Sequence, residues 1–269
     1  MIFIGFVAAL FVGLSLGLLG GGGSILTVPL LVYVFNVPPP VATAYSLLIV
    51  GTSSLVGSVP YLAQGLASPK TALFFSFPSF LMVFITRKFI MPLVPNTIFE
   101  TGDFVLTKST MIMCVFAVLM LLSAKSMIWG RRGTNDDDID TIRRRLNYPI
   151  IFLEGLLVGF ITGFVGVGGG FLIIPVLTNF IKLPMKFAVG TSLMIIAINS
   201  LFGYLGDVGQ HAIDWTFVSK MIAMSVVGVL LGSYLSRFIK SSQLKPTFGW
   251  FTLCLGLFIL LKETYLGGR

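Results

Sequence analysis

Charged residues are scarce in this chain of 269 residues, at 10% of the total, whereas hydrophobic residues make up 56%. A soluble domain typically carries about 25% charged residues, so we predict an integral membrane protein in contact with the lipid bilayer. The net charge of +8 does not change this, because the basic residues form short clusters between apolar runs and no nucleic-acid-binding motif accompanies them. No nucleic-acid partner is therefore expected.

Cysteine and histidine are rare too, which restricts the available chemistry. Cys114 and Cys254 each lie inside an apolar run, where they support neither a disulfide framework nor a metal site. A single histidine, without a cluster of intramembrane carboxylates, argues against a membrane enzyme. Nucleotide-binding motifs are also missing: Ile25 and Phe171 stand where GxGxxG needs its third glycine, and GxxxxGK followed by Ser or Thr does not occur. We expect no catalytic residue, metal or cofactor.

An internal repeat organises the chain. With an offset of 146 residues, LGGGGSILTVPLL (residues 19–31) aligns with VGVGGGFLIIPVL (residues 165–177), and the match continues without a gap. From Val12/Val158 to Gln64/Gln210, 18 of the 53 aligned pairs are identical, glycines and prolines among them. Internal repeats in membrane proteins are typical of transporters. We predict a first membrane repeat (1–129), a charged cytoplasmic linker (130–148) and a second membrane repeat (149–269).

Both repeats have the same order of predicted segments. A hairpin candidate is followed by three apolar runs, most of them near the roughly 20 residues that cross a bilayer. The hairpins cover residues 2–36 and 149–183, and the runs cover 41–63, 71–92, 108–129, 186–206, 213–236 and 246–262. A single straight helix over residues 2–36 would be about 52 Å long, far beyond the bilayer core, so we expect the chain to turn back at its glycine run.

The predicted fold is therefore an all-α polytopic membrane protein with two homologous halves, each a glycine-turn helical hairpin plus three transmembrane helices. An odd number of crossings per half would make the halves inverted repeats. The arginine-rich linker favours a cytoplasmic position by the positive-inside rule, which indicates a multi-pass protein of the cell inner (cytoplasmic) membrane. Lys220, near the start of its segment, is expected to snorkel to the interface; the alternative is that it offsets the charge of the substrate. In this topology Arg87 and Lys88 lie on the outer side of the membrane.

The glycine runs predict an anion site. Backbone at membrane depth that is not helical must be satisfied by protein, water or a ligand. Ser24 marks the expected start of the short second helix, whose free N–H groups and positive dipole end attract anions. We predict substrate-binding positions at Gly20, Gly21, Gly22, Gly23 and Ser24 and at Gly166, Gly168, Gly169 and Gly170. The alternative is that these glycines serve only close helix packing.

These paired motifs resemble the TauE/SafE sulfite exporter family, also called the toluene sulfonate uptake permease family. Each glycine motif is followed by a proline and then by ATAYSL or AVGTSL, and the resemblance covers nearly the whole chain. It implies a secondary carrier for sulfite, sulfonates or related organosulfur anions, working by alternating access as a symporter or antiporter. An anion channel using the same helix ends is the alternative. Substrate, direction and oligomeric state are not predicted, and Ala44-Tyr45-Ser46 departs from Gly190-Thr191-Ser192.

Polar residues that match across the repeat complete the candidate site. As neutral donors they would replace water around sulfonate oxygens, although a lone hydroxyl in a membrane helix more often bonds its own backbone. These pairs are Ser46 with Ser192, Ser53-Ser54 with Asn199-Ser200, and Gln64 with Gln210. Asp207, His211 and Asp214 share one short loop; a carboxylate beside the only histidine suits proton coupling, and exposed loop polarity explains them equally well.

Overall fold

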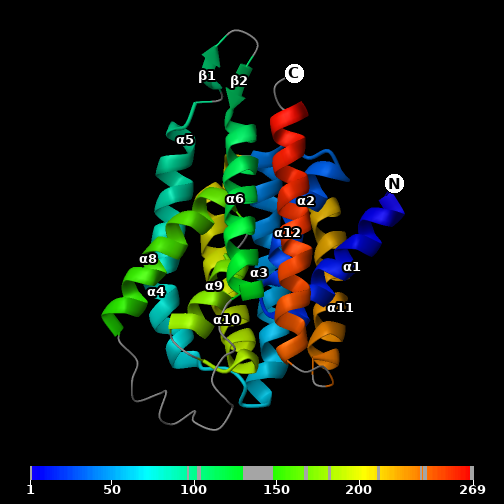
Figure 1. Ribbon diagram of the computed structural model, residues 1–269, viewed down its shortest axis with the longest axis vertical. Helices are drawn as coiled ribbons and strands as arrows, with labels where there is room; N and C mark the ends of the chain where they lie inside the picture. Colours follow the sequence, from blue (N-terminus) through cyan, green and yellow to red (C-terminus); the bar gives the residue numbers. More distant parts are fainter. Residues whose placement is uncertain are drawn as a thin grey trace.

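The protein forms a bundle of helices in the computed structural model (Figure 1). The structure describes residues 2–95, 97–101, 104–129, 148–166, 169–180, 183–210, 213–236, 238 and 241–266, so nearly all of the predicted linker lies outside it. The helices of the first half are α1 (Ile2–Leu19), α2 (Gly22–Tyr33), α3 (Pro39–Ala63), α4 (Pro69–Ile85), the π-helical turn η1 (Thr86–Ile90), α5 (Met91–Leu93) and α6 (Lys108–Trp129). Those of the second half are α8 (Tyr148–Val165), α9 (Gly170–Pro175), the π-helical turn η2 (Val176–Phe180), α10 (Met185–Asp207), α11 (Trp215–Leu235) and α12 (Ser241–Leu266).

Several of these helices are long and apolar enough to cross a membrane. Among the described residues there are five such spans: Pro39–Ala63, Pro69–Leu93, Lys108–Lys125, Met185–Asp207 and Trp215–Leu235. Shorter apolar helices occupy Gly5–Leu19, Gly22–Tyr33 and Ile151–Val165. The predicted helical, multi-pass membrane architecture is confirmed, and the helix bounds follow the apolar runs of the sequence closely.

The chain turns at its first glycine run, as predicted, but the second helix begins earlier than expected. α1 ends at Leu19 and α2 begins at Gly22, two residues before Ser24. Ser24 does not cap the helix; its Oγ donates to the Gly21 carbonyl at 2.6 Å. Glycine inside the helix is required by packing, because a methyl group at Gly23 would collide with the Val12 carbonyl on α1. The close packing of α2 on α1 thus outweighs the roughly 1 kcal/mol by which each glycine destabilises a helix relative to alanine.

A small β-hairpin was not predicted. Strands β1 (Thr97–Thr101) and β2 (Phe104–Thr107) pair antiparallel between α5 and α6, at the top of Figure 1. The sequences TIFET and FVLT are rich in β-branched and aromatic residues, which favour strands. The hairpin lies in a connection between helices, so the predicted all-α class holds for the bundle itself.

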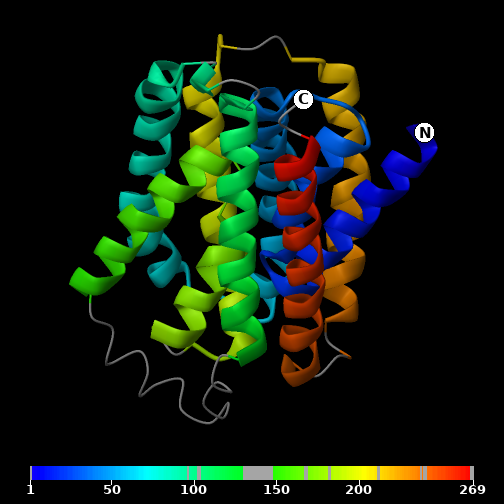
Figure 2. The ribbon, with the colours of Figure 1, turned by 45° about the horizontal axis from the view of Figure 1, so that its top comes forward.

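Helices of one half pack against helices of the other. α1 lies along α11 and α8 lies along α4, while α3 packs on α10 and α6 on α12. Exchanging the halves turns the pair α1 with α11 into the pair α8 with α4, and it turns the pairs α3 with α10 and α6 with α12 into themselves. Figures 1 and 2 place the tilted helices α1 and α8 on opposite sides of the bundle. In Figure 1, α3, α6 and α11 run downward, whereas α4, α10 and α12 run upward.

Glycines bring α1 and α11 into backbone contact. A methyl group at Gly13 would collide with the Ser225 carbonyl, and one at Gly228 would collide with the Leu10 carbonyl. The repeat partner of Gly13, Gly159 on α8, meets the Ser79 carbonyl on α4 in the same way. Small residues commonly allow such close approach between membrane helices.

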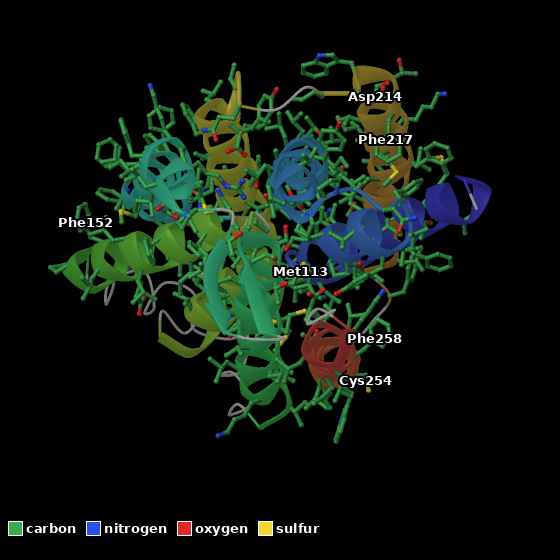
Figure 3. The ribbon with its side chains drawn as sticks, turned by 90° about the horizontal axis from the view of Figure 1, so that it is seen from above. Met113, Phe152, Asp214, Phe217, Cys254 and Phe258 are labelled. Carbon is green, nitrogen blue, oxygen red and sulfur yellow. The ribbon has the colours of Figure 1, made fainter. Side chains whose placement is uncertain are left out.

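The outer surface of the bundle is apolar. In Figure 3, seen from above, Met113 lies near the centre of the bundle, and Phe152, Cys254 and Phe258 lie at its periphery. Met113 is fully buried, whereas Phe152 and Phe258 are about half exposed. Such exposed apolar side chains are what a helix presents to lipid.

The contact between α1 and α11 yields a first prediction. Gly228→Leu should destabilise the protein by about 1–3 kcal/mol, because the new side chain must push α1 away. Thermal unfolding of the detergent-solubilised protein measures this. Val227→Leu is the matched control, since Val227 is adjacent and exposed. Equal unfolding temperatures for the two variants would contradict the packing described here.

Candidate functional site

The two glycine turns meet inside the bundle. Gly20 to Ser24 are all buried, as are Gly166, Gly169 and Gly170. A methyl group at Gly21 would collide with the Gly170 carbonyl, and one at Gly170 would lie 2.7 Å from the Gly21 Cα atom. The contact is therefore between backbones, and it brings the start of α2 to the start of α9. Gly168 lies outside the described residues.

Each turn also packs on a long helix of the opposite half. Gly20 has φ +67° and its backbone lies against Val189 on α10; Gly166 has φ +73° and lies against Thr43 on α3. Positive φ angles of this kind favour glycine strongly. Gly20 and Gly166 are repeat partners, and so are Val189 and Thr43, so the same arrangement occurs twice.

Ser192 and Ser46, a repeat-related pair, differ in their hydrogen bonds. Ser192 Oγ lies 2.6 Å from the Gly20 carbonyl and 2.8 Å from the Val189 carbonyl, so it ties α10 to the first glycine turn. Ser46 is fully buried on α3, but its hydroxyl has no partner among the described residues. The structure therefore leaves one of the two hydroxyls available for another group.

More buried polar side chains lie on α3 and α10, which pack on each other. Asn199 Nδ2 donates to Ser79 Oγ at 2.7 Å, while Asn199 Oδ1 has no partner within the described part of the chain. The same holds for the hydroxyls of Ser53, Ser54 and Ser200. We call Ser46, Ser53, Ser54, Asn199 and Ser200 the polar seam. A buried polar group left unpaired costs about 1–3 kcal/mol, so water or a ligand is the expected partner.

Arg87 is a component that the sequence analysis did not include among the candidate binding residues. The predicted topology puts it on the outer side of the membrane, and in the structure its side chain is only 2% exposed. Its Nη1 atom donates to Asp207 Oδ2 at 2.9 Å and to Thr43 Oγ1 at 3.0 Å. Arg87 tolerates burial because Asp207 supplies the opposite charge. One feature of the sequence could have indicated this pair. Arg87 and Asp207 both stand at ends of apolar segments, and the predicted topology places these two ends on the same side of the membrane.

Asp207 and Asp214 have separate roles in the structure. Asp207 is the last residue of α10 and is 5% exposed, so the expectation of exposed loop polarity is wrong for it. Asp214 caps α11 by accepting a hydrogen bond from Phe217 N at 3.0 Å, and Figure 3 labels both residues at the start of that helix. His211 lies outside the described residues. Lys220 is exposed, as a snorkelling lysine would be.

The two matched glutamines lie at exposed helix ends. Gln64 Nε2 donates to the Pro60 carbonyl at 2.7 Å. Gln210 Nε2 donates to the Gly206 carbonyl at 2.8 Å and lies 3.3 Å from the carbonyl of Arg87. Both amides thus bind backbone at helix ends, and their role in anion binding stays a prediction.

Comparison with known protein families shows to which family the chain belongs. The sequence model described as "Sulfite exporter TauE/SafE" matches residues 5–259. The chain belongs to the TauE/SafE family. This membership agrees with the resemblance of the paired glycine motifs, and it covers both halves and the contact between their turns.

Relatives of this TauE/SafE chain bear transporter names. A "Probable membrane transporter protein" of Xylella fastidiosa (strain 9a5c) is 28% identical over 94% of this chain and 92% of its own length. "Probable membrane transporter protein YunE" of Bacillus subtilis is 25% identical over 86% of this chain and 89% of its own. No solved structure matches the chain. The family and these names support a membrane transporter rather than an enzyme.

The first glycine turn yields a second prediction. Gly20→Ala should lower the free energy of unfolding by more than Gly65→Ala does, as measured by thermal unfolding in detergent. Both glycines have positive φ, at +67° and +69°, so both variants carry the backbone cost of about 1–2 kcal/mol. Only at Gly20 would the methyl group also meet Val189 and Ser192, because nothing lies within 4 Å of it at Gly65. Equal losses would show that the turn is loosely packed.

Proposed function

We propose that the chain is a secondary transporter of small sulfur-containing anions: sulfite, sulfonates or related organosulfur anions. The observation that carries this proposal is the backbone contact between Gly21 and Gly170, which gathers two helix starts in the interior of a TauE/SafE family member. Neither α2 nor α9 has a side-chain cap, so the first N–H groups of both are free of such partners. Free N–H groups at the start of a helix favour an oxyanion.

The polar seam supports a binding site made mostly of neutral donors. Its hydroxyls are buried, have no partners in the described part of the chain, and lie on α3 and α10, the helices on which both turns pack. Hydroxyl groups replace the water around an oxyanion without trapping it as an isolated buried cation would. Such a site suits a carrier, which must release its substrate in every cycle.

Alternating access between inverted repeats is the proposed mechanism. Its support is that equivalent helices, such as α3 and α10, run in opposite directions, and that helices of each half pack on the other (Figure 1). In repeats of this kind one half rocks against the other about a site at the bilayer midplane. We propose an inner-membrane location with the linker in the cytoplasm, and proton coupling as the first coupling to test.

Flux measurements test the function directly. The purified protein in proteoliposomes should take up radiolabelled sulfite or an alkanesulfonate with saturable kinetics and accumulate it against its gradient when a proton or sodium gradient is imposed. Uptake that is non-saturable and never uphill would indicate the alternative function, an anion channel that uses the same helix ends. Absence of anion flux in either form would overturn the proposal.

The polar seam yields a third prediction. Ser46→Ala should raise the KM for the transported anion about tenfold, the effect of losing one hydrogen bond to a charged group. Ser58→Ala is the matched control, because Ser58 is buried on the same helix but its hydroxyl already donates to the Leu55 carbonyl. Concentration dependence of uptake in proteoliposomes gives both values. An unchanged KM in Ser46→Ala would remove this hydroxyl from the site.

A further inference from the structure

The guanidinium group of Arg87 is only partly used by the protein. Nη1 binds Asp207 and Thr43, whereas Nε and Nη2 are buried and have no partner among the described residues. The N–H groups of Nε and Nη2 point in a planar fork that matches two oxygens of one oxyanion. Two buried donors of a cation left unpaired are costly, and this side chain is one of the largest that is fully buried.

One of the two unused donors, Nη2, lies against the second glycine turn. A methyl group at Gly166 would collide with Arg87 Nη2, so nothing but hydrogen at that position separates the turn from the guanidinium. Two further hydroxyls close by lack partners in the described chain: that of Thr86, next to Arg87 on η1, and that of Thr162, against Gly169. Unpaired donors therefore lie at the turn itself, from Arg87 and Thr162, and on η1 next to Arg87, from Thr86. Arg87 itself lies on a π-helical turn, a local distortion frequent at functional sites.

The charges around Arg87 favour an anion. Half-buried Lys108, at the start of α6, lies near enough to Arg87 and Asp207 to interact electrostatically with both, and its Nζ donates to the Met91 carbonyl at 2.5 Å. Two cations against one carboxylate leave this region positive. The two repeat-related positions are uncharged: Ser233 and Tyr61 stand where Arg87 and Asp207 stand here. There the Tyr61 hydroxyl donates to the Gly17 carbonyl at 2.7 Å, so an uncharged hydrogen bond joins α3 to α1.

We infer that Arg87 is the cationic binding residue for the substrate oxyanion, holding a sulfite or sulfonate group with its Nε and Nη2 donors beside Gly166. The inference rests on the proposed function. It assigns one charged residue to the proposed site, and this residue has no charged counterpart at the repeat-related position. Asp207 and Thr43 fix the guanidinium plane through Nη1. Because Asp207 offsets part of the positive charge, the anion is held by directed hydrogen bonds and can still leave.

The test compares variants of the full chain in phosphatidylethanolamine and phosphatidylglycerol proteoliposomes, with sulfite and methanesulfonate as probes. Arg87→Met combined with Asp207→Asn removes both charges together, since breaking one partner alone would leave a buried charge. Arg87→Lys keeps the charge and the pairing but loses the planar fork. Lys88→Gln is the matched control, because Lys88 is the exposed neighbour on the same π-helical turn.

The double variant should remain folded, with an unfolding temperature near that of wild type, and its KM for both probes should rise at least about tenfold. Arg87→Lys should also raise KM, and Lys88→Gln should leave it unchanged. A wild-type KM in Arg87→Lys, or in a folded double variant, would overturn the inference and leave the proposed function standing. A lower maximal rate with an unchanged KM would likewise overturn it, by showing a structural role. A wild-type protein that carries neither probe would refute the proposed function itself.

Discussion

The close approach of Gly21 and Gly170 is the constraint on which the rest of the structure depends. A bilayer offers no water to satisfy broken backbone, so interrupted helices are tolerated only where protein surrounds them. Here the interruptions are buried against one another and against α10 and α3. This requirement explains why each hairpin must reach into the opposite half, and why helix pairs such as α1 with α11 are also closed by glycine.

The scaffold is symmetric in its packing but asymmetric in its charges. Val189 and Thr43 receive the two glycine turns in the same way, yet Thr43 also accepts a hydrogen bond from Arg87 while the Val189 side chain has no polar atom. The Arg87–Asp207 pair is replaced in the other half by Ser233 and Tyr61. The two halves thus contain similar backbone breaks, and a few side chains make them chemically different.

Regular features were predictable because they depend on local properties. The apolar runs gave the long helices, and a run of about 35 residues was too long for one crossing, so the turn at Gly20 followed. The start of α2 was misplaced at Ser24 because the contact of Gly23 with Val12 is not visible in local propensity. The β-hairpin at Thr97–Thr107 was missed because its two strands are short, although their residues favour strands.

The sequence by itself determined the duplication, the membrane-spanning helices and the positions of the glycine turns, since hydrophobicity and residue identity along the chain are sufficient for these. Tertiary structure alone decided which polar groups are paired. Arg87 and Asp207 are 120 residues apart, and whether such an arginine lies at the lipid interface or inside the bundle depends on a partner brought by another helix. The same holds for Ser46 and Ser192, which match in sequence but differ because only Ser192 reaches a backbone carbonyl of the opposite turn. Burial and partnership are properties of contacts between distant segments, and a linear pattern does not contain them.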